Sequence, residues 1–200
     1  MKILITSNAG EPHKYLWSKI LGTHHEVYVF AQIHLNTSRA VSSKGMSRLS
    51  NIYNTYKTDF RGKLKTKKSN AFFNQDEKIQ ATKYFKYDKQ LIENFKESDC
   101  YFEFADIKGK EAIDKIKSIN PDLILVQGGK ILPTDFFESC SVGTIHMHGG
   151  FCPDYRGGRS WYACLFNDDL THVGPTVQEI DAGIDTGNII KKLNNELLSE

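Results

Sequence analysis

Long hydrophobic runs are absent from this 200-residue chain. The longest aliphatic stretch, Leu123 to Val126, is far shorter than the roughly 20 apolar residues that a membrane-spanning helix needs. The N-terminal sequence MKILITSNAG becomes polar too soon for a secretory signal peptide. We therefore expect a soluble, cytoplasmic protein with no membrane partner.

Closely spaced cysteines and an excess of one charge are also lacking. The four cysteines, Cys100, Cys140, Cys152 and Cys164, form no C-x-x-C pair, which favours reduced thiols. The 26 basic and 24 acidic residues nearly cancel, which gives no indication of a nucleic-acid partner. The apolar residues (40%) and aromatic residues (12%) exclude disorder as the main state of the chain.

The near-neutral total conceals one basic segment. Residues 44–70 contain eight lysines or arginines and one aspartate, a net charge of +7, and the rest of the chain carries −5. The segment also contains Tyr53, Tyr56 and Phe60, which could stack on a ring. Two interpretations remain open: a solvated loop with extended lysines, or an electropositive flap over an anionic ligand such as a nucleotide diphosphate.

Strand and helix patterns alternate along the chain and define the expected fold class. Apolar runs predict strands over residues 2–6, 26–31, 100–105, 122–127 and 143–148, followed by two antiparallel strands over 172–180 and 187–193. Helices are predicted after residue 10 and over residues 75–97, 109–118 and 134–139. This order predicts an α/β fold, Rossmann-like and doubly wound, with a mostly parallel sheet and an antiparallel C-terminal extension. We expect a single domain over residues 1–200 with a basic insertion at about 33–98.

Apolar residues at helical spacing identify the faces that two of these helices should bury. The stripe in the first helix consists of Tyr15, Leu16, Ile20 and Leu21, and the stripe in the 75–97 helix of Tyr84, Tyr87, Leu91 and Phe95. The turn after the first strand contains neither G-x-G-x-x-G nor G-x-x-x-x-G-K-[ST]. A dinucleotide fingerprint and a phosphate-binding P-loop are therefore excluded at this turn.

Two histidines lie near the end of the predicted strand 143–148. His146 and His148 are two residues apart, so their side chains point to the same face of the strand, at the sheet edge where α/β proteins bind ligands. Asp181 and Asp185 lie in a later turn, and a carboxylate beside a histidine is typical of acid–base catalysis because it fixes the tautomer and raises the imidazole pKa. H-x-H is also a common zinc pair, and Asp181 or Asp185 could supply a third ligand. Because no other cysteine or histidine has a recognisable ligand spacing, we predict no metal.

Three motifs in this order resemble the folate-dependent formyltransferases. They are HMH at 146–148, CPDYRG at 152–157 and DAGIDTG at 181–187, and GGKILP at 128–133 resembles the segment whose backbone lines the folate pocket. The resemblance is close over residues 120–192. It implies an N-formyltransferase that moves a formyl group from 10-formyltetrahydrofolate to the amine of a small anionic substrate.

The resemblance also implies a role for each matching residue. His148 corresponds to the catalytic histidine, a proton shuttle, and Asp185 to the aspartate that orients it; His146 occupies the position of an oxyanion-stabilising asparagine. The implied cofactor-binding residues are Gly129, Lys130, Ile131, Leu132, Asp181 and Gly183. The implied substrate-binding residues are Ser7, Asn8, Gly149, Gly150, Tyr155 and Arg156. Turn formation explains Ser7, Asn8 and Asp181 equally well, and ion pairing explains Arg156.

The basic, aromatic segment favours a nucleotide-linked amino sugar as the amine substrate. Glycinamide ribonucleotide is the alternative among the substrates of this family. Methionyl-tRNA is disfavoured because the tRNA-binding domain of that branch does not follow within the 200 residues, so no nucleic-acid partner is expected. Histidine in place of asparagine at position 146 also leaves open a folate-binding pseudo-enzyme or regulatory protein. A homodimer is an expectation from the family alone.

Overall fold

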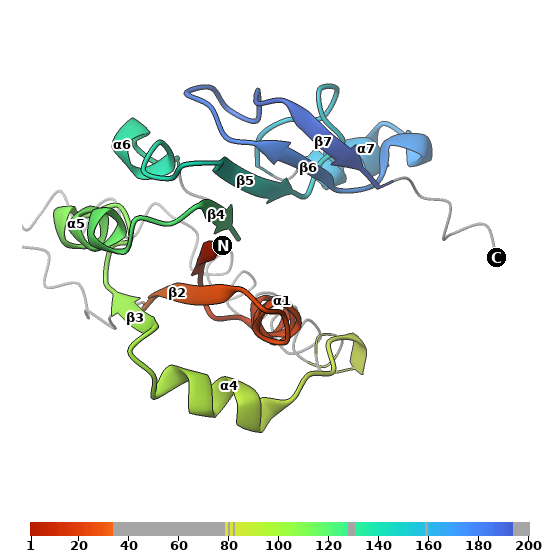
Figure 1. Ribbon diagram of the computed structural model, residues 1–200. Coiled ribbons are helices and arrows are strands. Elements are labelled where there is room, and N and C mark those ends of the chain that lie inside the picture. Colours follow the sequence, from red (N-terminus) through yellow and green to blue (C-terminus); the bar gives the residue numbers. More distant parts are fainter. Residues whose placement is uncertain (34–78, 80, 82, 128–130, 159, 194–200) are drawn as a thin grey trace, which may run out of the picture. The chain divides into compact units, whose positions relative to one another are not determined.

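The computed structural model describes residues 1–33, 79, 81, 83–127, 131–158 and 160–193. The chain divides into two compact units, Met1–His34 with Tyr87–Glu200, and Leu35–Lys86. The basic segment 44–70 falls in the second unit and lies outside the described residues. The first unit contains the candidate site and is shown in Figure 1.

A seven-stranded sheet with the order β3-β2-β1-β4-β5-β6-β7 forms the framework of the first unit (Figure 1). Its strands are β1 (Lys2–Ser7), β2 (Glu26–Gln32), β3 (Tyr101–Phe104), β4 (Leu123–Val126), β5 (Gly143–His148), β6 (Thr176–Glu179) and β7 (Ile189–Lys192). The pairs from β3 to β5 are parallel, whereas β5–β6 and β6–β7 are antiparallel. The predicted mostly parallel sheet with an antiparallel C-terminal extension is confirmed.

Helices cover the two faces of the parallel part because its central strand is apolar on both sides. In β1, Leu4 packs into one cluster with residues of α5 (Lys110–Ile119) and α6 (Thr134–Phe137). Its neighbours Ile3 and Ile5 pack into a second cluster with residues of α1 (Glu11–Leu21) and α4 (Lys89–Lys96). Successive side chains of a strand point to opposite faces, so one continuous apolar run serves both clusters.

Two short elements, α7 (Ser160–Phe166) and the 3-10 turn η1 (Leu170–His172), connect β5 to β6. Neither element is among those predicted from the sequence. Their importance lies in Ser160, the first residue of α7, which is buried next to His148 of β5.

The prediction of one helix over residues 75–97 is wrong, because residues 85–88 are not helical and α4 begins only after Asp88. The Asp88 carboxylate accepts a hydrogen bond from the Leu91 amide (3.1 Å), so Asp88 acts as the N-cap that starts a new helix. The predicted stripe is right in part, since Tyr87 and Phe95 pack against the core cluster that contains Ile92. Ile92, which the stripe omits, is buried, whereas Tyr84 is 65% exposed.

The first helix is anchored by a residue that the predicted stripe omits. Trp17 is completely buried, and its Nε1 donates a hydrogen bond to Oε1 of Gln127 (3.1 Å), directly after β4. Ile20 and Leu21 of the predicted stripe pack around the same cluster but stay partly exposed. Trp17 therefore ties α1 to the carboxyl end of β4.

Two further features concern the cysteines and the helices. All four cysteines belong to the described residues and are free thiols, as their spacing predicts. Among the helices of the described ranges, none combines the length and the apolar character needed to cross a membrane.

Candidate active site

The histidines of the site stand on β5, opposite polar residues of β6. His146 pairs with Gln178 and His148 with Thr176 across the antiparallel ladder. Directly opposite residues of such a ladder share one face of the sheet, so the four side chains stand together. Thr176 and Gln178 are almost completely buried.

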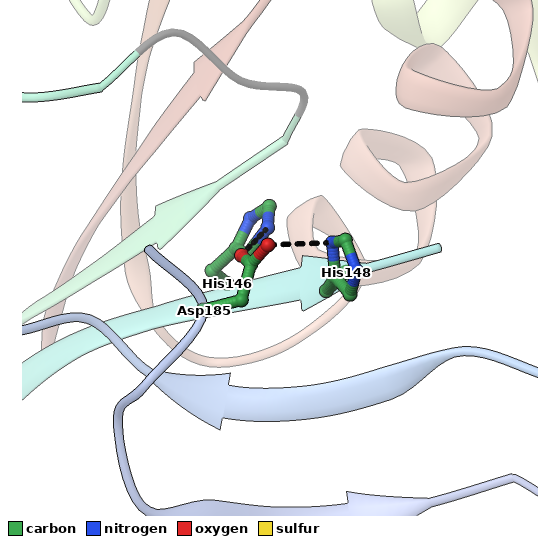
Figure 2. Close-up of side chains that lie close together, drawn as sticks. All are labelled: His146, His148 and Asp185. Carbon is green, nitrogen blue, oxygen red and sulfur yellow. Dashed lines mark ion pairs between the residues drawn. The ribbon is translucent and has the colours of Figure 1, made fainter. Parts of the chain in front are cut away.

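The Asp185 carboxylate lies between the two histidines (Figure 2). Its Oδ1 is 3.7 Å from Nε2 of His146, and its Oδ2 is 3.5 Å from Nδ1 of His148. The three side chains are only 9–15% exposed. The structure therefore brings together the three residues that the sequence analysis assigned to catalysis.

The turn between β6 and β7 directs Asp185 toward the histidines. Oδ1 of Asp181 accepts hydrogen bonds from the Gly183 amide (3.0 Å) and from Oγ1 of Thr186 (2.6 Å). A Cβ atom on Gly183 would lie 1.9 Å from that Thr186 oxygen, so the turn needs glycine there. Asp185 itself adopts a left-handed conformation (φ 51°), which is uncommon for residues other than glycine. The D-A-G-I-D-T-G motif is therefore a compact turn that presents one carboxylate.

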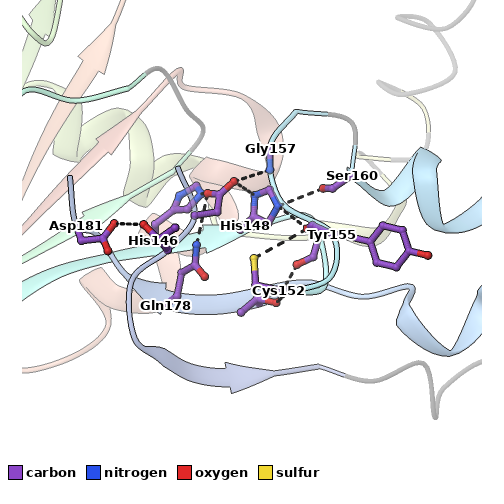
Figure 3. A network of polar contacts seen from close by, with 12 residues as sticks. His146, His148, Cys152, Tyr155, Gly157, Ser160, Gln178 and Asp181 are labelled. Atoms are coloured by element: carbon purple, nitrogen blue, oxygen red, sulfur yellow. Dashed lines mark hydrogen bonds and ion pairs between the residues drawn. The ribbon is translucent and has the colours of Figure 1, made fainter. Parts of the chain in front are cut away.

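Two further contacts hold the Asp185 carboxylate in place (Figure 3). The Gly157 amide donates to Oδ2 (2.8 Å), and Nε2 of Gln178 donates to Oδ1 (3.4 Å). Gly157 belongs to the loop after β5, and Gln178 belongs to β6. The carboxylate thus joins three segments that are far apart in the sequence.

A backbone carbonyl fixes the tautomer of His148. Its Nε2 lies 3.3 Å from the Tyr155 carbonyl oxygen and 3.2 Å from Oγ of Ser160. Because a carbonyl oxygen only accepts hydrogen bonds, Nε2 carries the proton. In the neutral ring, Nδ1 is then the nitrogen with the lone pair, and it is the nitrogen that faces Asp185.

Burial controls the protonation of His146. It lowers the pKa of this histidine below its usual value, while the Asp185 charge and the Val126 backbone raise it and the neighbouring His148 lowers it. Burial outweighs the carboxylate, so the net shift of the His146 pKa is downward. The expected effect of a neighbouring carboxylate, to raise an imidazole pKa, is present at His146 as the Asp185 contribution, and burial outweighs it.

Adjacent glycines of the loop after β5 have different surroundings. A Cβ atom on Gly150 would lie 2.2 Å from Oγ of Ser160 and 2.4 Å from the Tyr155 carbonyl, the two groups that contact His148. A Cβ atom on Gly149 would have no atom within 4 Å among those of the described residues. Thr176 anchors the loop, because its hydroxyl donates to the Gly150 carbonyl (2.8 Å). Gly150 therefore permits the close packing that orients His148.

The other predicted substrate-binding residues direct their side chains to other partners or to solvent. The Tyr155 ring points away from them in Figure 3, and its hydroxyl donates to Oδ2 of Asp169 (2.9 Å). Arg156 is exposed. Ser7 is buried, with its hydroxyl 2.9 Å from Nδ1 of His13, and exposed Asn8 accepts a hydrogen bond from the Gly10 amide (3.1 Å).

The cluster borders an open cavity of about 600 Å³. This volume lies within the range of about 300–1,000 Å³ typical of small-molecule sites. The cavity is lined by all three catalytic candidates and by Gly149, Ile131, Leu132, Asp181 and Gly183 from the predicted binding residues. Gly129 and Lys130 lie outside the described residues.

Three residues of the site escaped the sequence analysis: Ser160, Thr176 and Gln178. For Thr176 and Gln178 the sequence offered only an indirect indication. The predicted strands 143–148 and 172–180 can be expected to pair, but the sequence leaves the register of that pair open. Only the register shows that Gln178 stands opposite His146 and Thr176 opposite His148. Ser160 carried no signal of its own.

A sheet of this topology, with two histidines and a carboxylate at a cavity beside β5, defines a Rossmann-like domain with a candidate active site. Residues 41–200 match the family model described as "Formyl transferase", and the chain belongs to that family. The resemblance drawn from the H-x-H, P-x-Y-R-G and D-x-G-x-D-T-G elements is thereby confirmed.

The segments that match sequence relatives cover only a short part of each relative. A methionyl-tRNA formyltransferase of Geobacter metallireducens is 38% identical over 87 residues, which is 43% of this chain and 28% of the relative. A second, from Clostridioides difficile, is 41% identical over 86 residues, again 28% of that protein. The matches therefore span less than a third of these relatives.

Solved structures with low sequence identity share the fold. A phosphoribosylglycinamide formyltransferase from Streptococcus pneumoniae TIGR4 has a TM-score of 0.53 at 14% identity, covering 97% of this chain and 82% of that chain. A sugar N-formyltransferase from Shewanella sp. FDAARGOS_354 has a TM-score of 0.51 at 14% identity, covering 97% of this chain and 56% of that chain. These similarities concern the fold alone.

The neighbouring glycines Gly149 and Gly150 provide a matched pair of variants. We expect Gly150→Ala to lower the free energy of unfolding by about 1–3 kcal/mol, because the new methyl group displaces Ser160 or the Tyr155 carbonyl. Gly149→Ala should change it by less than about 0.5 kcal/mol. Urea unfolding of both variants measures the difference, and equal stabilities would contradict the packing assigned to Gly150.

The protonation of His146 can be followed by an NMR titration. We expect His146 to titrate below the usual histidine pKa of about 6.5, and Asp185→Asn to lower this pKa further because it removes a charge that favours the imidazolium ion. Asp169→Asn is the control, since Asp169 pairs with His172 instead (2.8 Å). A His146 pKa that rises in Asp185→Asn would contradict the assigned electrostatics.

Proposed function

We propose that this protein is an N-formyltransferase that moves the formyl group of 10-formyltetrahydrofolate to an amine. The observation that carries the proposal is the Asp185 carboxylate between His146 and His148 at the wall of the cavity. Membership of the formyl transferase family supports the reaction type. The cavity volume suits a small-molecule cofactor and acceptor.

In the proposed reaction, the unprotonated amine attacks the formyl carbon and forms the new C–N bond. The bond between that carbon and N10 of the cofactor breaks, the amine nitrogen loses one proton, and N10 gains one. His148 is the proposed shuttle for this proton, because an imidazole accepts and releases protons near neutral pH. Asp185 orients the ring and stabilises its charged form.

His146 is the proposed donor to the oxygen that becomes negative during the attack. Burial favours its neutral ring, which still carries one N–H group. Loss of one such donor typically raises the barrier by about 2.7–4 kcal/mol. Asparagine at this position also offers an N–H donor, so we expect His146→Asn to change the rate only modestly.

The proposed cofactor-binding residues Ile131, Leu132, Asp181 and Gly183 share the cavity wall with the three proposed catalytic residues. Gly129 and Lys130 remain proposed cofactor-binding residues on the resemblance of the segment GGKILP alone. Gly149, on the same wall, is the proposed point of close approach for the acceptor. Ser7, Asn8, Tyr155 and Arg156 remain proposed contacts for the more distant parts of the acceptor, and Gly150 contributes by packing.

We further propose a nucleotide-linked amino sugar as the acceptor. The support is the +7 segment at residues 44–70 with its three aromatic residues, which suits a diphosphate and a base. Methionyl-tRNA is the second candidate, because the sequence relatives are named for it. Glycinamide ribonucleotide is the third, on the name of a structural neighbour.

A comparison of His148→Asn with His172→Asn tests the proposed shuttle. We expect His148→Asn to lower kcat for formyl transfer by about 100- to 10,000-fold, as loss of a general acid–base group typically does. His172→Asn is the matched control, because His172 also pairs with an aspartate but does not line the cavity. Formation of tetrahydrofolate from 10-formyltetrahydrofolate measures the rate, and a wild-type rate in His148→Asn would contradict the proposed role.

The acceptor is identified by running the same assay with UDP- and dTDP-linked amino sugars, the free amino sugars, glycinamide ribonucleotide and methionyl-tRNA. Turnover with a nucleotide-linked sugar but not with the free sugar would support the proposed acceptor. No turnover with any amine, together with activity that appears in His146→Asn, would instead identify a folate-binding pseudo-enzyme.

A further inference from the structure

Two imidazoles and one carboxylate converge at the catalytic cluster, and this is also a set of metal ligands. The candidate ligand atoms of His146, His148 and Asp185 all lie within 4.8 Å of one another. We propose that these three residues form a binding site for a divalent transition metal ion of the zinc type. The proposal departs from the expectation of no metal, which rested on ligand spacing along the sequence.

The distances within the cluster are close to those of a zinc site. Nε2 of His146 and Nδ1 of His148 are 3.7 and 3.5 Å from the Asp185 oxygens. Ligands that are about 2.0–2.1 Å from a tetrahedral zinc ion are about 3.3 Å apart. The two histidine–aspartate distances are therefore slightly longer than the separation expected of zinc ligands, and all three candidate ligand atoms lie within 4.8 Å of one another.

The His172–Asp169 pair shows what a direct hydrogen bond looks like in the same chain. There Nδ1 of His172 is 2.8 Å from Oδ1 of Asp169. In the catalytic cluster, by contrast, the carboxylate stands at a longer distance from both histidines. The spacing at Asp185 thus resembles a ligand–ligand separation more than a hydrogen bond.

The surroundings of the ligands match those of a metal site (Figure 3). Nε2 of His148 faces the Tyr155 carbonyl and Ser160, which leaves the Nδ1 lone pair directed at the cluster. A ligating histidine usually donates its other N–H to a carbonyl or carboxylate in this way. Asp185 is held by the Gly157 amide and by Gln178. The orientation of two of the three ligands is therefore fixed before an ion binds.

The donor set indicates which metals fit. Two imidazoles and one carboxylate suit zinc and the neighbouring transition metals rather than magnesium or calcium, which prefer oxygen ligands. Because the cluster borders the open cavity, an ion has an entry path and a fourth position for water or a ligand.

Metal binding would compete with the proposed reaction. The Nδ1 lone pair of His148 cannot accept a proton and bind an ion at the same time, so a bound zinc ion should inhibit formyl transfer and a chelator should restore it. This consequence rests on the proposed function, whereas metal binding itself does not.

The experiment titrates metal-free protein with Zn²⁺ in competition with a chromophoric chelator. We expect one equivalent bound at this site with a dissociation constant of about 1 µM or tighter. His146→Asn and Asp185→Asn should each weaken this binding by at least about 10-fold. Circular dichroism of each variant verifies that it is folded.

His172→Asn and His25→Asn are the controls, because they remove histidines outside the cluster without touching it. The absorption spectrum of the Co²⁺ complex then separates the cluster from thiolate ligands, since the four free cysteines are the main competing donors. Wild-type affinity in His146→Asn, or a thiolate band in the Co²⁺ spectrum, would overturn the proposal.

The result separates the two proposals. Zinc binding at the cluster without formyl transfer by the metal-free protein would leave the metal site standing and refute the proposed function. Formyl transfer without zinc binding would do the reverse.

Discussion

The candidate active site depends on one interaction, the approach of the Asp185 carboxylate to both His146 and His148. Alternation along β5 places both histidines on one face, and the antiparallel β6 brings the following turn back beside them. The turn then uses a left-handed residue and Gly183 to aim the carboxylate. The parallel part of the sheet serves as the rigid support for this arrangement.

Burial sets the chemistry of the cluster. Removal of water lowers the pKa of His146, so its ring favours the neutral form beside a carboxylate. The backbone carbonyl of Tyr155 fixes the tautomer of His148. As a result, the neutral His146 ring keeps one N–H group as the proposed donor to the formyl oxygen. The bare Nδ1 of His148 can accept a proton or bind a metal ion, but not both at once.

Much of this site could be predicted because its parts are local in sequence. Apolar runs located the strands, and the two-residue spacing of His146 and His148 placed both on one face. The D-x-G-x-D-T-G motif identified Asp185 through its resemblance to the formyltransferases, and in the structure Asp181, Gly183 and Thr186 form the turn that carries it.

The parts that could not be predicted depend on contacts between distant segments. The register that sets Gln178 opposite His146 is decided by pairing of β5 with β6, and Ser160 reaches His148 only because Gly150 leaves room. Helical periodicity alone also missed Trp17, which packs among residues of β1 and β2 and donates a hydrogen bond to Gln127, 110 positions away in the sequence. The same periodicity extended the predicted helix 75–97 across Asp88, where the Asp88 side chain caps the start of α4.

The most direct test of the central claim is the single-turnover rate of formyl transfer in Asp185→Asn, with Asp169→Asn as the control. Asparagine is close to aspartate in shape but removes the negative charge. We expect a fall of about 100- to 10,000-fold in Asp185→Asn and a nearly unchanged rate in Asp169→Asn. Equal rates in the two variants would show that the carboxylate between the histidines does not govern the chemistry of this site.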